Sequence, residues 1–366
     1  MIEMGVIIRP LGSSSFRKPG NFSPQTRGSV TYSLSYPLPP PTTLAGALAQ
    51  IVYQRDSSCK ELDDKNFEIL SDVKKCLEKL GVKRLTGAFA IFEEGEAKEL
   101  TAFDGTPILG LRKLVKELER SGKKIEDLLK REVLIPSKSK NLFEVMKRPI
   151  PQIGATELTG IALHRTKKQT GIESSKGMIY IQERRYIAVQ EGKKIIMGSI
   201  VADIYGDLRH EEKTILGFGG EGLPARLELS KKNLIEEELS HLWNGRNGGE
   251  CLLLIATPLL FKEPLNVRSS SFAQLREKIE KLLKNEIKHF TPKEEDFLKS
   301  IVPPYRVEVD AFSLGWSLAK NRPRGFRHGI WKGLFYGNCD DWHKLYREGA
   351  GDLRELGFGT LVPIPI

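Results

Sequence analysis

The sequence predicts an α+β protein built from two units, and three observations support this. Segments with strand and helix patterns alternate through both halves of the 366 residues. A chain of this length exceeds one ordinary compact domain, so two domains are the natural expectation. A hydrophobic content of 40% is enough for real cores and argues against extended disorder. We expect one domain over residues 1–210 and a second over residues 211–366.

The first half should begin with a strand, a long loop and a helix. Residues 6–8 have a short strand pattern, and the Gly- and Ser-rich stretch LGSSSFRKPGNFSPQTRGS follows as a loop. The four prolines within residues 37–41 each fix the backbone, which predicts an extended segment. Thr42 or Thr43 can then cap a helix that begins Leu-Ala-Gly-Ala. Small side chains in its first turns leave room for a bulky group to lie close against the helix.

Further elements of the first half follow from periodicity. Helical patterns cover residues 64–80, 111–120 and 125–131, and strand patterns cover residues 85–92 and 195–205. The strand-prone runs GIALHRTK and GMIYIQERRYIAV flank the polar, glycine-bearing run QTGIESSKG. This arrangement predicts a protruding hairpin over residues 159–190.

The second half repeats the alternation of strands and helices. Strand patterns occur in LPARLEL, CLLLIATPLLF and YRVEVDAFSLGW. The clearest helix of the chain covers residues 272–290, with one apolar and one charged face. The C-terminal LRELGFGTLVPIPI predicts a helical turn, a glycine loop and a last strand. We expect the boundary between the units to lie between Asp203 and Leu216.

The chain carries a marked excess of positive charge. The formal charge is +10, and five basic residues, Arg27 among them, but no acidic one lie between Glu3 and Asp56. Such an excess points to a polyanion as partner. The densest basic segment, LAKNRPRGFRHGIWKG, interleaves arginines with Phe326, His328 and Trp331, so it can grip phosphates and stack on unpaired bases. A solvated basic loop is the alternative.

A second basic set lies on the predicted hairpin and supports two interpretations. A ribbon with a basic shaft and an apolar residue near its tip, such as Ile172 or Met178, can wedge into a nucleic-acid strand. An edge hairpin whose lysines prevent pairing between sheets is equally consistent with the pattern. The basic residues of this set are His164, Arg165, Lys167, Lys168, Lys176, Arg184 and Arg185.

Two glycine loops share a GFG core, GFGGEG at residues 217–222 and GFGT at residues 357–360. Consecutive glycines can turn backbone N–H groups toward an anion, and a tight turn without ligand is the alternative. Neither loop continues into Gly-Lys-Ser/Thr, which excludes a P-loop. GFGGEG also lacks the glycine spacing of a dinucleotide site.

Catalytic signals are weak, and we expect no enzyme, no cofactor and no metal site. Asp340, Asp341 and His343 have no partner pair with metal-binding spacing, so a solvated acidic turn is expected there. His164 could act as a base in metal-free RNA cleavage, although a phosphate-facing histidine is the more ordinary role. Neither G-x-S-x-G nor H-E-x-x-H occurs in the chain.

The cysteines and the N-terminal residues indicate a compartment. The four cysteines form no C-x-x-C pair, which argues against a zinc knuckle or a disulfide scaffold and is typical of a reducing interior. MIEMGVIIRP lacks the apolar core of a signal peptide, and no run is long enough to span a bilayer. We therefore expect a cytoplasmic protein with no membrane partner.

The order of several motifs resembles a known family. A loop containing Phe16-Arg17 leads through the proline run to Thr-Leu-Ala-Gly-Ala, and the hairpin GIALHRTKKQTGIESSKGMIY follows. LGFGGEGLPARLEL, a SLGW…RPRG segment and LRELGFGTL complete the series. This order is similar to that of the third-subunit family of the Cmr complex, the type III-B CRISPR effector, within the RAMP superfamily. Residues 56–80 and 111–150 match no part of this pattern.

The resemblance implies a fold, a function and partners. The fold would be two ferredoxin-like (RRM-like) domains with a thumb-like hairpin and extra helical insertions. The function would be non-catalytic binding of the 5′ repeat-derived tag of the CRISPR RNA (crRNA), in antiviral defence. The partners would be the large palm-domain Cas subunit, the neighbouring backbone RAMP subunit, and target RNA near the tag–guide junction.

The RNA-binding residues expected from the matching motifs and the basic segments come from the loop, the first helix, the hairpin, the glycine turn and the basic segment. They are Ser14, Ser15, Phe16, Arg17, Lys18, Arg27, Leu44, Ala45, Gly46, Ala47, His164, Arg165, Lys167, Lys168, Met178, Gly219, Gly220, Glu221, Trp316, Arg322, Arg324, Arg327 and His328. Two other functions remain open. One is a metal-independent CRISPR RNA-processing endoribonuclease of the RAMP superfamily, and the other is a protein-only scaffold subunit.

Overall fold

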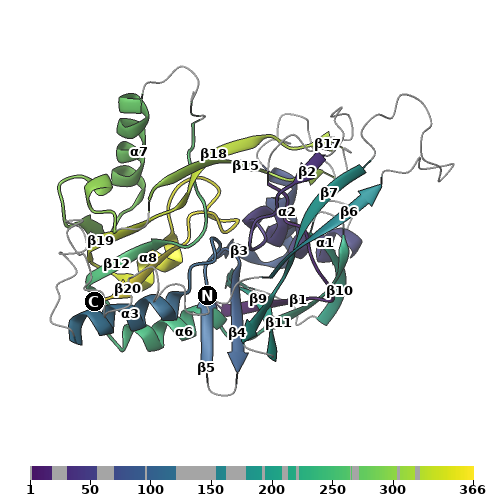
Figure 1. The fold of residues 1–366 in the computed structure, drawn as a ribbon, viewed down its shortest axis with the longest axis horizontal. Helices are drawn as coiled ribbons and strands as arrows, with labels where there is room; N and C mark the ends of the chain where they lie inside the picture. The colour runs from purple at the N-terminus through teal and green to yellow at the C-terminus, as the bar shows by residue number, and fades with distance from the viewer. Residues whose placement is uncertain are drawn as a thin grey trace.

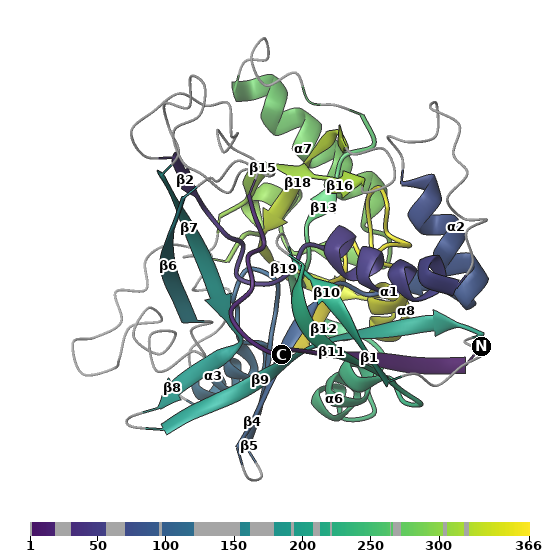
Figure 2. The same cartoon turned by 90° about the vertical axis from the view of Figure 1, so that its right-hand side faces the viewer.

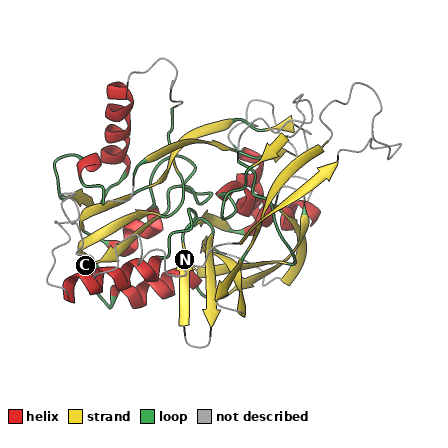
Figure 3. Cartoon of the chain, in the orientation of Figure 1, coloured by secondary structure: helices red, strands yellow, loops and turns green. Residues whose placement is uncertain are grey.

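The computed structural model describes most of the chain. The described ranges are residues 2–18, 31–55, 70–94, 97–120, 154–161, 179–191, 194–207, 213–219, 222–263, 265, 272–302, 306–317 and 322–366. Figure 3 shows how helices, strands and loops are distributed over them. The expected mixture of antiparallel sheets and helices is confirmed.

An eight-stranded antiparallel sheet occupies the right-hand part of Figure 1. Its main path runs β10–β11–β1–β9–β4–β5, and β3 and β8 both pair with β9 off this path. The strands are β1 (Ile2–Pro10), β3 (Val82–Leu85), β4 (Phe89–Glu94), β5 (Ala97–Thr101), β8 (Ala188–Glu191), β9 (Lys194–Gly206), β10 (Lys213–Phe218) and β11 (Leu223–Ser230). Strand β9 therefore organises this sheet.

Helices cover both faces of this sheet. On one face, Ile200 and Ile204 of β9 belong to the same core as the apolar residues of α1 and α2. On the other face, Val201 and Tyr205 belong to a core shared with α3 and α6. Because both faces are covered, β9 reads as a nearly continuous apolar run. The helices are α1 (Pro41–Arg55), α2 (Ser71–Leu80), α3 (Ile108–Arg120) and α6 (Leu234–Trp243).

A four-stranded antiparallel sheet with the order β14–β19–β12–β20 lies in the other half of the molecule. Its strands are β12 (Gly249–Ile255), β14 (Phe290–Pro292), β19 (Leu334–Cys339) and β20 (Leu361–Pro365). The remaining helical segments are α7 (Phe272–Glu286), η3 (Phe297–Lys299) and α8 (Trp342–Glu348). Side chains from this sheet, α3 and α6 share one core, so the two halves are packed together.

The structure also contains smaller sheets. The sheet β13–β18–β15 consists of β13 (Leu259–Leu260), β15 (Glu308–Ser313) and β18 (Phe326–Lys332), and β16 (Trp316–Ser317) pairs with β17 (Arg322–Pro323). The third sheet has the order β2–β7–β6, with β2 (Thr31–Ser33), β6 (Gly154–Ile161) and β7 (Ile179–Tyr186). Figures 1 and 2 show β6 and β7 as long neighbouring strands at one side of the molecule. The tip of the predicted hairpin lies outside the described residues.

Two buried carboxylates tie β9, α6 and α8 together. Asp203 accepts hydrogen bonds from three backbone N–H groups at the start of α6 and from the hydroxyl of Tyr346. Burial raises the pKa of Asp203 to about 7 although these hydrogen bonds act in the opposite direction. Glu236 accepts from Tyr205 and Arg347, and its oxygen lies 2.8 Å from Nδ1 of His343. Burial acts to raise the pKa of Glu236, but these contacts outweigh burial and lower it.

The acidic turn expected near residue 340 is instead the start of helix α8. The side chain of Asp341 accepts a hydrogen bond from the backbone N–H of Lys344 and so caps the helix. His343 packs edge-to-face against Trp243, with ring centroids 4.5 Å apart. Asp340 is exposed, as a solvated acidic turn predicts, but the sequence did not show that Asp341 caps a helix or that His343 contacts α6, about a hundred residues earlier.

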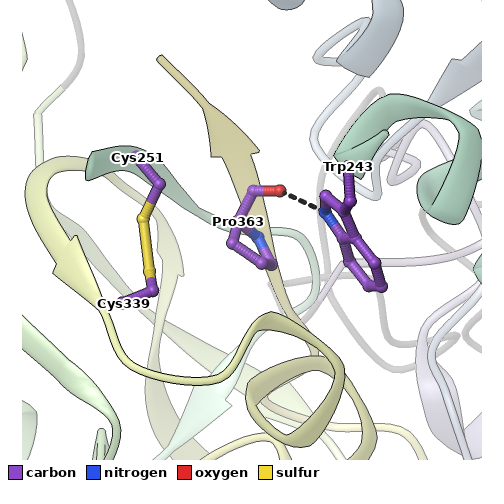
Figure 4. The surroundings of a disulfide bond; sticks show 4 residues. All are labelled: Trp243, Cys251, Cys339 and Pro363. Carbon is purple, nitrogen blue, oxygen red and sulfur yellow. Dashed lines mark hydrogen bonds between the residues drawn. A yellow bond between two sulfur atoms is a disulfide. The ribbon is translucent and has the colours of Figure 1, made fainter. Parts of the chain in front are cut away.

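The sequence argued against a disulfide scaffold and predicted no particular cysteine pair, but the structure contains a disulfide. Cys251 of β12 and Cys339 of β19 are linked, with their Cα atoms 6.5 Å apart, as Figure 4 shows. The two strands are neighbours: Gly249 pairs with Cys339, and Cys251 pairs with Gly337. The two cysteines are therefore diagonal neighbours on the same face of the sheet, which brings their sulfur atoms together. Nearby, Nε1 of Trp243 donates a 2.9 Å hydrogen bond to the carbonyl of Pro363 in β20. A cross-strand pair 88 residues apart has no local sequence signature.

Several predicted elements match the structure, whereas others were missed. The strands expected at 6–8 and 195–205 and the helix expected at 272–290 correspond to β1, β9 and α7. Helices α6 and α8 were not predicted. The division at residue 210 stays a prediction, and β10 and β11, which follow it, pair into the sheet of the first half through β1.

Candidate nucleic-acid interface

Residues 14–18 of the predicted loop lie between two other segments of the chain and form backbone hydrogen bonds with both. Ser14 exchanges backbone hydrogen bonds of 2.9 and 2.7 Å with Arg185 of β7. On its other side the segment pairs with residues 34–36, because Lys18 N donates to Leu34 O and Tyr36 N donates to Phe16 O. The segment is therefore held at both edges, and the base of β7 is fixed to it.

An ion pair and several side-chain hydrogen bonds strengthen this junction. The guanidinium of Arg185 lies 2.6 Å from the carboxylate of Glu183 and donates a 3.0 Å hydrogen bond to the carbonyl of Ser35. The same carboxylate accepts from the backbone N–H of Ser35, whose hydroxyl in turn accepts from the N–H of Phe16. Both partners of the ion pair are largely buried, so solvent screens it little.

The glycine turn after β10 lies against the same segment. Gly219 has a φ of +77°, which an L side chain rarely adopts. A Cβ there would lie 3.1 Å from the carbonyl oxygen of Ser15. The ring of Phe16 also packs edge-to-face on Phe218, at a centroid distance of 5.8 Å. The structure therefore brings together two of the predicted binding segments.

An aromatic cluster connects this region to the second half of the chain. Tyr36 contacts Phe103, stacks on Phe312 of β15 and packs on Trp331 of β18. Its hydroxyl lies 3.5 Å from the carbonyl of Ala311, and burial raises its pKa above the ordinary value. The ammonium of Lys18 lies 5.3 Å from the Tyr36 ring centroid and 4.8 Å from that of Trp331. Lys18 thus makes cation–π contacts to both halves.

The start of helix α1 has the open surface that its small residues predict. Leu44, Ala45 and Ala47 are buried in the core, whereas Gly46 is partly exposed. A Cβ built on Gly46 would meet no atom within 4 Å, and its φ is not positive. No acidic residue lies in the first turn. Neither packing nor backbone conformation therefore explains why position 46 is a glycine.

From residue 322 onward, the basic segment is one arm of a ribbon and not a loop. Residues 313–317 pair with 322–326 in one continuous register, which extends the β15–β18 pair. The guanidinium of Arg324 forms an ion pair with Asp72 at the start of α2, and these side chains are only 5% and 13% exposed. Arg327 pairs across the ribbon with the buried Phe312, so it lies on the inner face. The predicted arginines therefore do not form one row.

Several predicted residues cannot be placed. Arg27, His164, Arg165, Lys167, Lys168, Met178, Gly220 and Glu221 lie outside the described residues. The side chains of Trp316 and Arg322 are likewise not described, although their backbones are. The RNA-binding role of every predicted residue stays a prediction.

Sequence reasoning missed the residues that hold the segments together. Ser35 and Tyr36 precede the proline run directly, and Glu183 is the single acid in the basic run QERRY. That lone acid was the available signal, because an acid among basic residues often pairs with one of them. The second glycine loop, GFGT, is a buried turn: a Cβ on Gly357 would lie 2.6 Å from the carbonyl oxygen of Thr86.

Within the described ranges, no group of three or more His, Cys, Asp or Glu side chains is arranged to hold a metal ion. No helix in those ranges is both long and apolar enough to cross a membrane.

No protein-family model matches the chain. Among curated proteins, it is similar to the CRISPR system CMR subunit Cmr3 of Saccharolobus solfataricus (strain ATCC 35092 / DSM 1617 / JCM 11322 / P2), with 28% identity over 244 residues. The match covers 64% of this chain and 66% of the Cmr3 protein, just under two thirds of that relative's length. The chain resembles Cmr3. The resemblance predicted from the motif order is thereby confirmed.

The chain also aligns with solved structures. One is a chain of the type III-B Cmr-beta bound to cognate target RNA, solved by cryo-EM. The TM-score is 0.49 with 17% identity, over 91% of this chain and 86% of that one. A structure of Cmr-beta with cognate target RNA and AMPPnP, state 1, gives a TM-score of 0.47 and 18% identity over the same shares.

Proposed function

We propose that the chain is a non-catalytic RNA-binding subunit of a type III-B CRISPR effector complex. It would hold the 5′ repeat-derived tag of the crRNA and link the large palm-domain subunit to the neighbouring backbone subunit. Similarity to Cmr3 supports the family of complexes. One observation carries the binding role: Lys18, Tyr36 and Trp331 meet where the predicted loop, the glycine turn and the basic ribbon converge.

The chemistry of these segments suits a single RNA strand. Basic side chains neutralise phosphates, and exposed glycine surfaces let a sugar-phosphate chain approach the protein backbone. The backbone hydrogen bonds of Arg185 with Ser14 and the hydrogen bonds of Glu183 and Arg185 with Ser35 fix β7 to the loop. A hairpin continuing from β6 and β7 would therefore project from the tag site in a set direction. We extend the proposal to a thumb at this hairpin that separates tag from guide, where target RNA would pair.

The fold that accompanies this function would be two ferredoxin-like domains. Each large sheet has helices packed on it, which is compatible with that arrangement. A binding role is preferred to catalysis because the converging residues are serines, glycines, aromatic rings and cations, which bind phosphates and bases. The endoribonuclease alternative depends on His164, outside the described residues.

Binding of a fluorescent crRNA to the full chain and to the assembled complex tests the proposal. We expect tight binding that weakens with salt and is lost when the 5′ tag, but not the guide, is scrambled. Ultraviolet crosslinking should yield RNA adducts on residues 14–18 or on the ribbon. Binding that ignores the tag sequence and yields no adducts on either segment would refute a tag-holding role.

The same material separates the two alternatives. Incubation of the pure chain with repeat RNA in EDTA should leave the RNA intact, and specific cleavage that a His164→Ala variant abolishes would favour the endoribonuclease. Crosslinks from both basic segments only to protein would favour a protein-only scaffold.

A further inference from the structure

Phe326 is exposed in a region where the other aromatic rings are not. Its side chain is 60% exposed at the start of β18, whereas Tyr36, Phe103 and Phe312 are buried. Trp331, five residues later on the same strand, is partly buried and has Lys18 and Tyr36 against its ring. An apolar ring left in water adds nothing to the stability of the fold, so packing does not account for the exposure of Phe326.

His328 fixes the orientation of this exposed ring. Phe326 and His328 are two positions apart, so their side chains lie on the same face of β18. Their rings meet edge-to-face, with centroids 5.8 Å apart and planes at 89°. Directly across the ribbon stand small residues, Ser313 opposite Phe326 and Ala311 opposite His328. No bulky side chain from β15 therefore competes for the space above the rings.

The strand that carries Phe326 is held in place. The carbonyl of Gly325 accepts a 3.0 Å hydrogen bond from the backbone N–H of Leu314. Gly325 itself lies on the opposite face of the strand, with Arg327. The ring of Phe326 therefore stands on a fixed backbone.

We propose that Phe326 is a stacking platform for one unpaired RNA base, with His328 orienting the platform. Every base has a flat π-face, so the platform would accept any of the four bases. This inference rests on the proposed function and deepens it. It also distinguishes Phe326 from Trp331, because the ring of Trp331 already contacts the ammonium of Lys18.

The test combines protein variants with abasic RNA. Binding of the crRNA 5′ region is measured in the assembled complex for the wild type, Phe326→Ala and Phe326→Trp, with Met197→Ala as control. Met197 is 65% exposed on β9, a comparably exposed apolar residue that has no place in the proposed site. Loss of one stacked base should weaken binding about 5- to 150-fold for Phe326→Ala. Phe326→Trp should restore binding, and the control should not change it.

Removing bases one at a time locates the contact. At one position an abasic nucleotide should weaken wild-type binding and have no further effect on Phe326→Ala, because both changes remove the same stack. Salt-sensitive, tag-dependent binding with no effect of Phe326→Ala would overturn the platform and leave the proposed function standing. Unchanged RNA affinity with loss of a partner subunit would overturn it in favour of protein docking. No binding by the wild type would refute the proposed function itself.

Discussion

Replacing Gly46 by alanine should strengthen helix α1 and weaken RNA binding at the same time. Gly46 lies in the body of the helix, and the added methyl group would meet no protein atom within 4 Å. Glycine inside a helix costs about 0.5–1 kcal/mol relative to alanine, because it loses more backbone freedom on folding. The variant should therefore be more stable by about that amount, with a melting temperature roughly 1–2 °C higher.

The effect on RNA should have the opposite sign. If a phosphate or ribose lies against the bare backbone at Gly46, a methyl group at this position would displace it. The complex would then lose at least one hydrogen bond between the charged phosphate and a neighbouring donor of the protein. Such a bond contributes about 1.5–3 kcal/mol, so affinity for the crRNA tag should fall at least about tenfold. Calorimetry or thermal unfolding measures the first effect, and fluorescence anisotropy with tagged crRNA measures the second.

Ala273→Gly in helix α7 provides the reverse control. Ala273 is exposed, so this change should lower stability by a similar amount and leave RNA binding unaltered. A Gly46→Ala variant that gains stability and binds the tag like the wild type would refute the close approach of RNA to α1.

Three further predictions concern contacts that the sequence did not reveal. Arg324→Ala should destabilise the fold by about 3–5 kcal/mol, because it leaves the carboxylate of Asp72 buried without its partner, and chemical denaturation measures this. Replacing both Cys251 and Cys339 by alanine should cost about 2–5 kcal/mol, and non-reduced peptide mapping of the wild type should recover the linked peptides. Burial raises the pKa of Glu99 to about 7, so the fold binds its proton more tightly than the unfolded chain does. Stability should therefore fall by up to about 3 kcal/mol as pH rises from about 4.5 to 7, and Glu99→Gln should flatten that profile in a thermal-unfolding series.

Each of these predictions has a result that would contradict it. Asp72→Asn combined with Arg324→Ala should recover part of the loss, and full stability of Arg324→Ala alone would mean that the ion pair contributes nothing. Complete alkylation of both cysteines in the denatured, non-reduced protein would exclude the disulfide. An unchanged pH profile in Glu99→Gln would show that the carboxyl titrates normally.

Local signals predicted the elements whose causes are local. The prolines and the small residues after them predicted a helix here, although α1 begins at Pro41, and Thr42 and Thr43 lie inside it and do not cap it. The apolar periodicity of residues 272–290 predicted α7. The strand pattern of residues 195–205 predicted β9, although only the packed structure explains why both of its faces are apolar. The order of motifs along the chain was enough to indicate the resemblance to Cmr3 that the comparison found.

The candidate site was predicted in its parts but not in its arrangement. Basic composition and glycine turns marked residues 14–18, Gly219 and the ribbon, because those signals depend only on residue type. Which arginine faces outward could not be read from sequence, since Asp72 is 252 residues from Arg324 and pairs with it only through the packing of α2 on the ribbon. The same holds for Lys18, whose ring partner Trp331 comes from the other half of the chain.

By itself, the sequence determined the helices and strands with strong periodicity, the positive charge and the order of motifs, because each depends on neighbouring residues or on composition. Only the tertiary structure decided which cysteines join, which arginine is engaged by an acid and which aromatic ring is left exposed. Those outcomes depend on strand register and helix packing, which bring together residues that are distant in the chain and leave no local pattern.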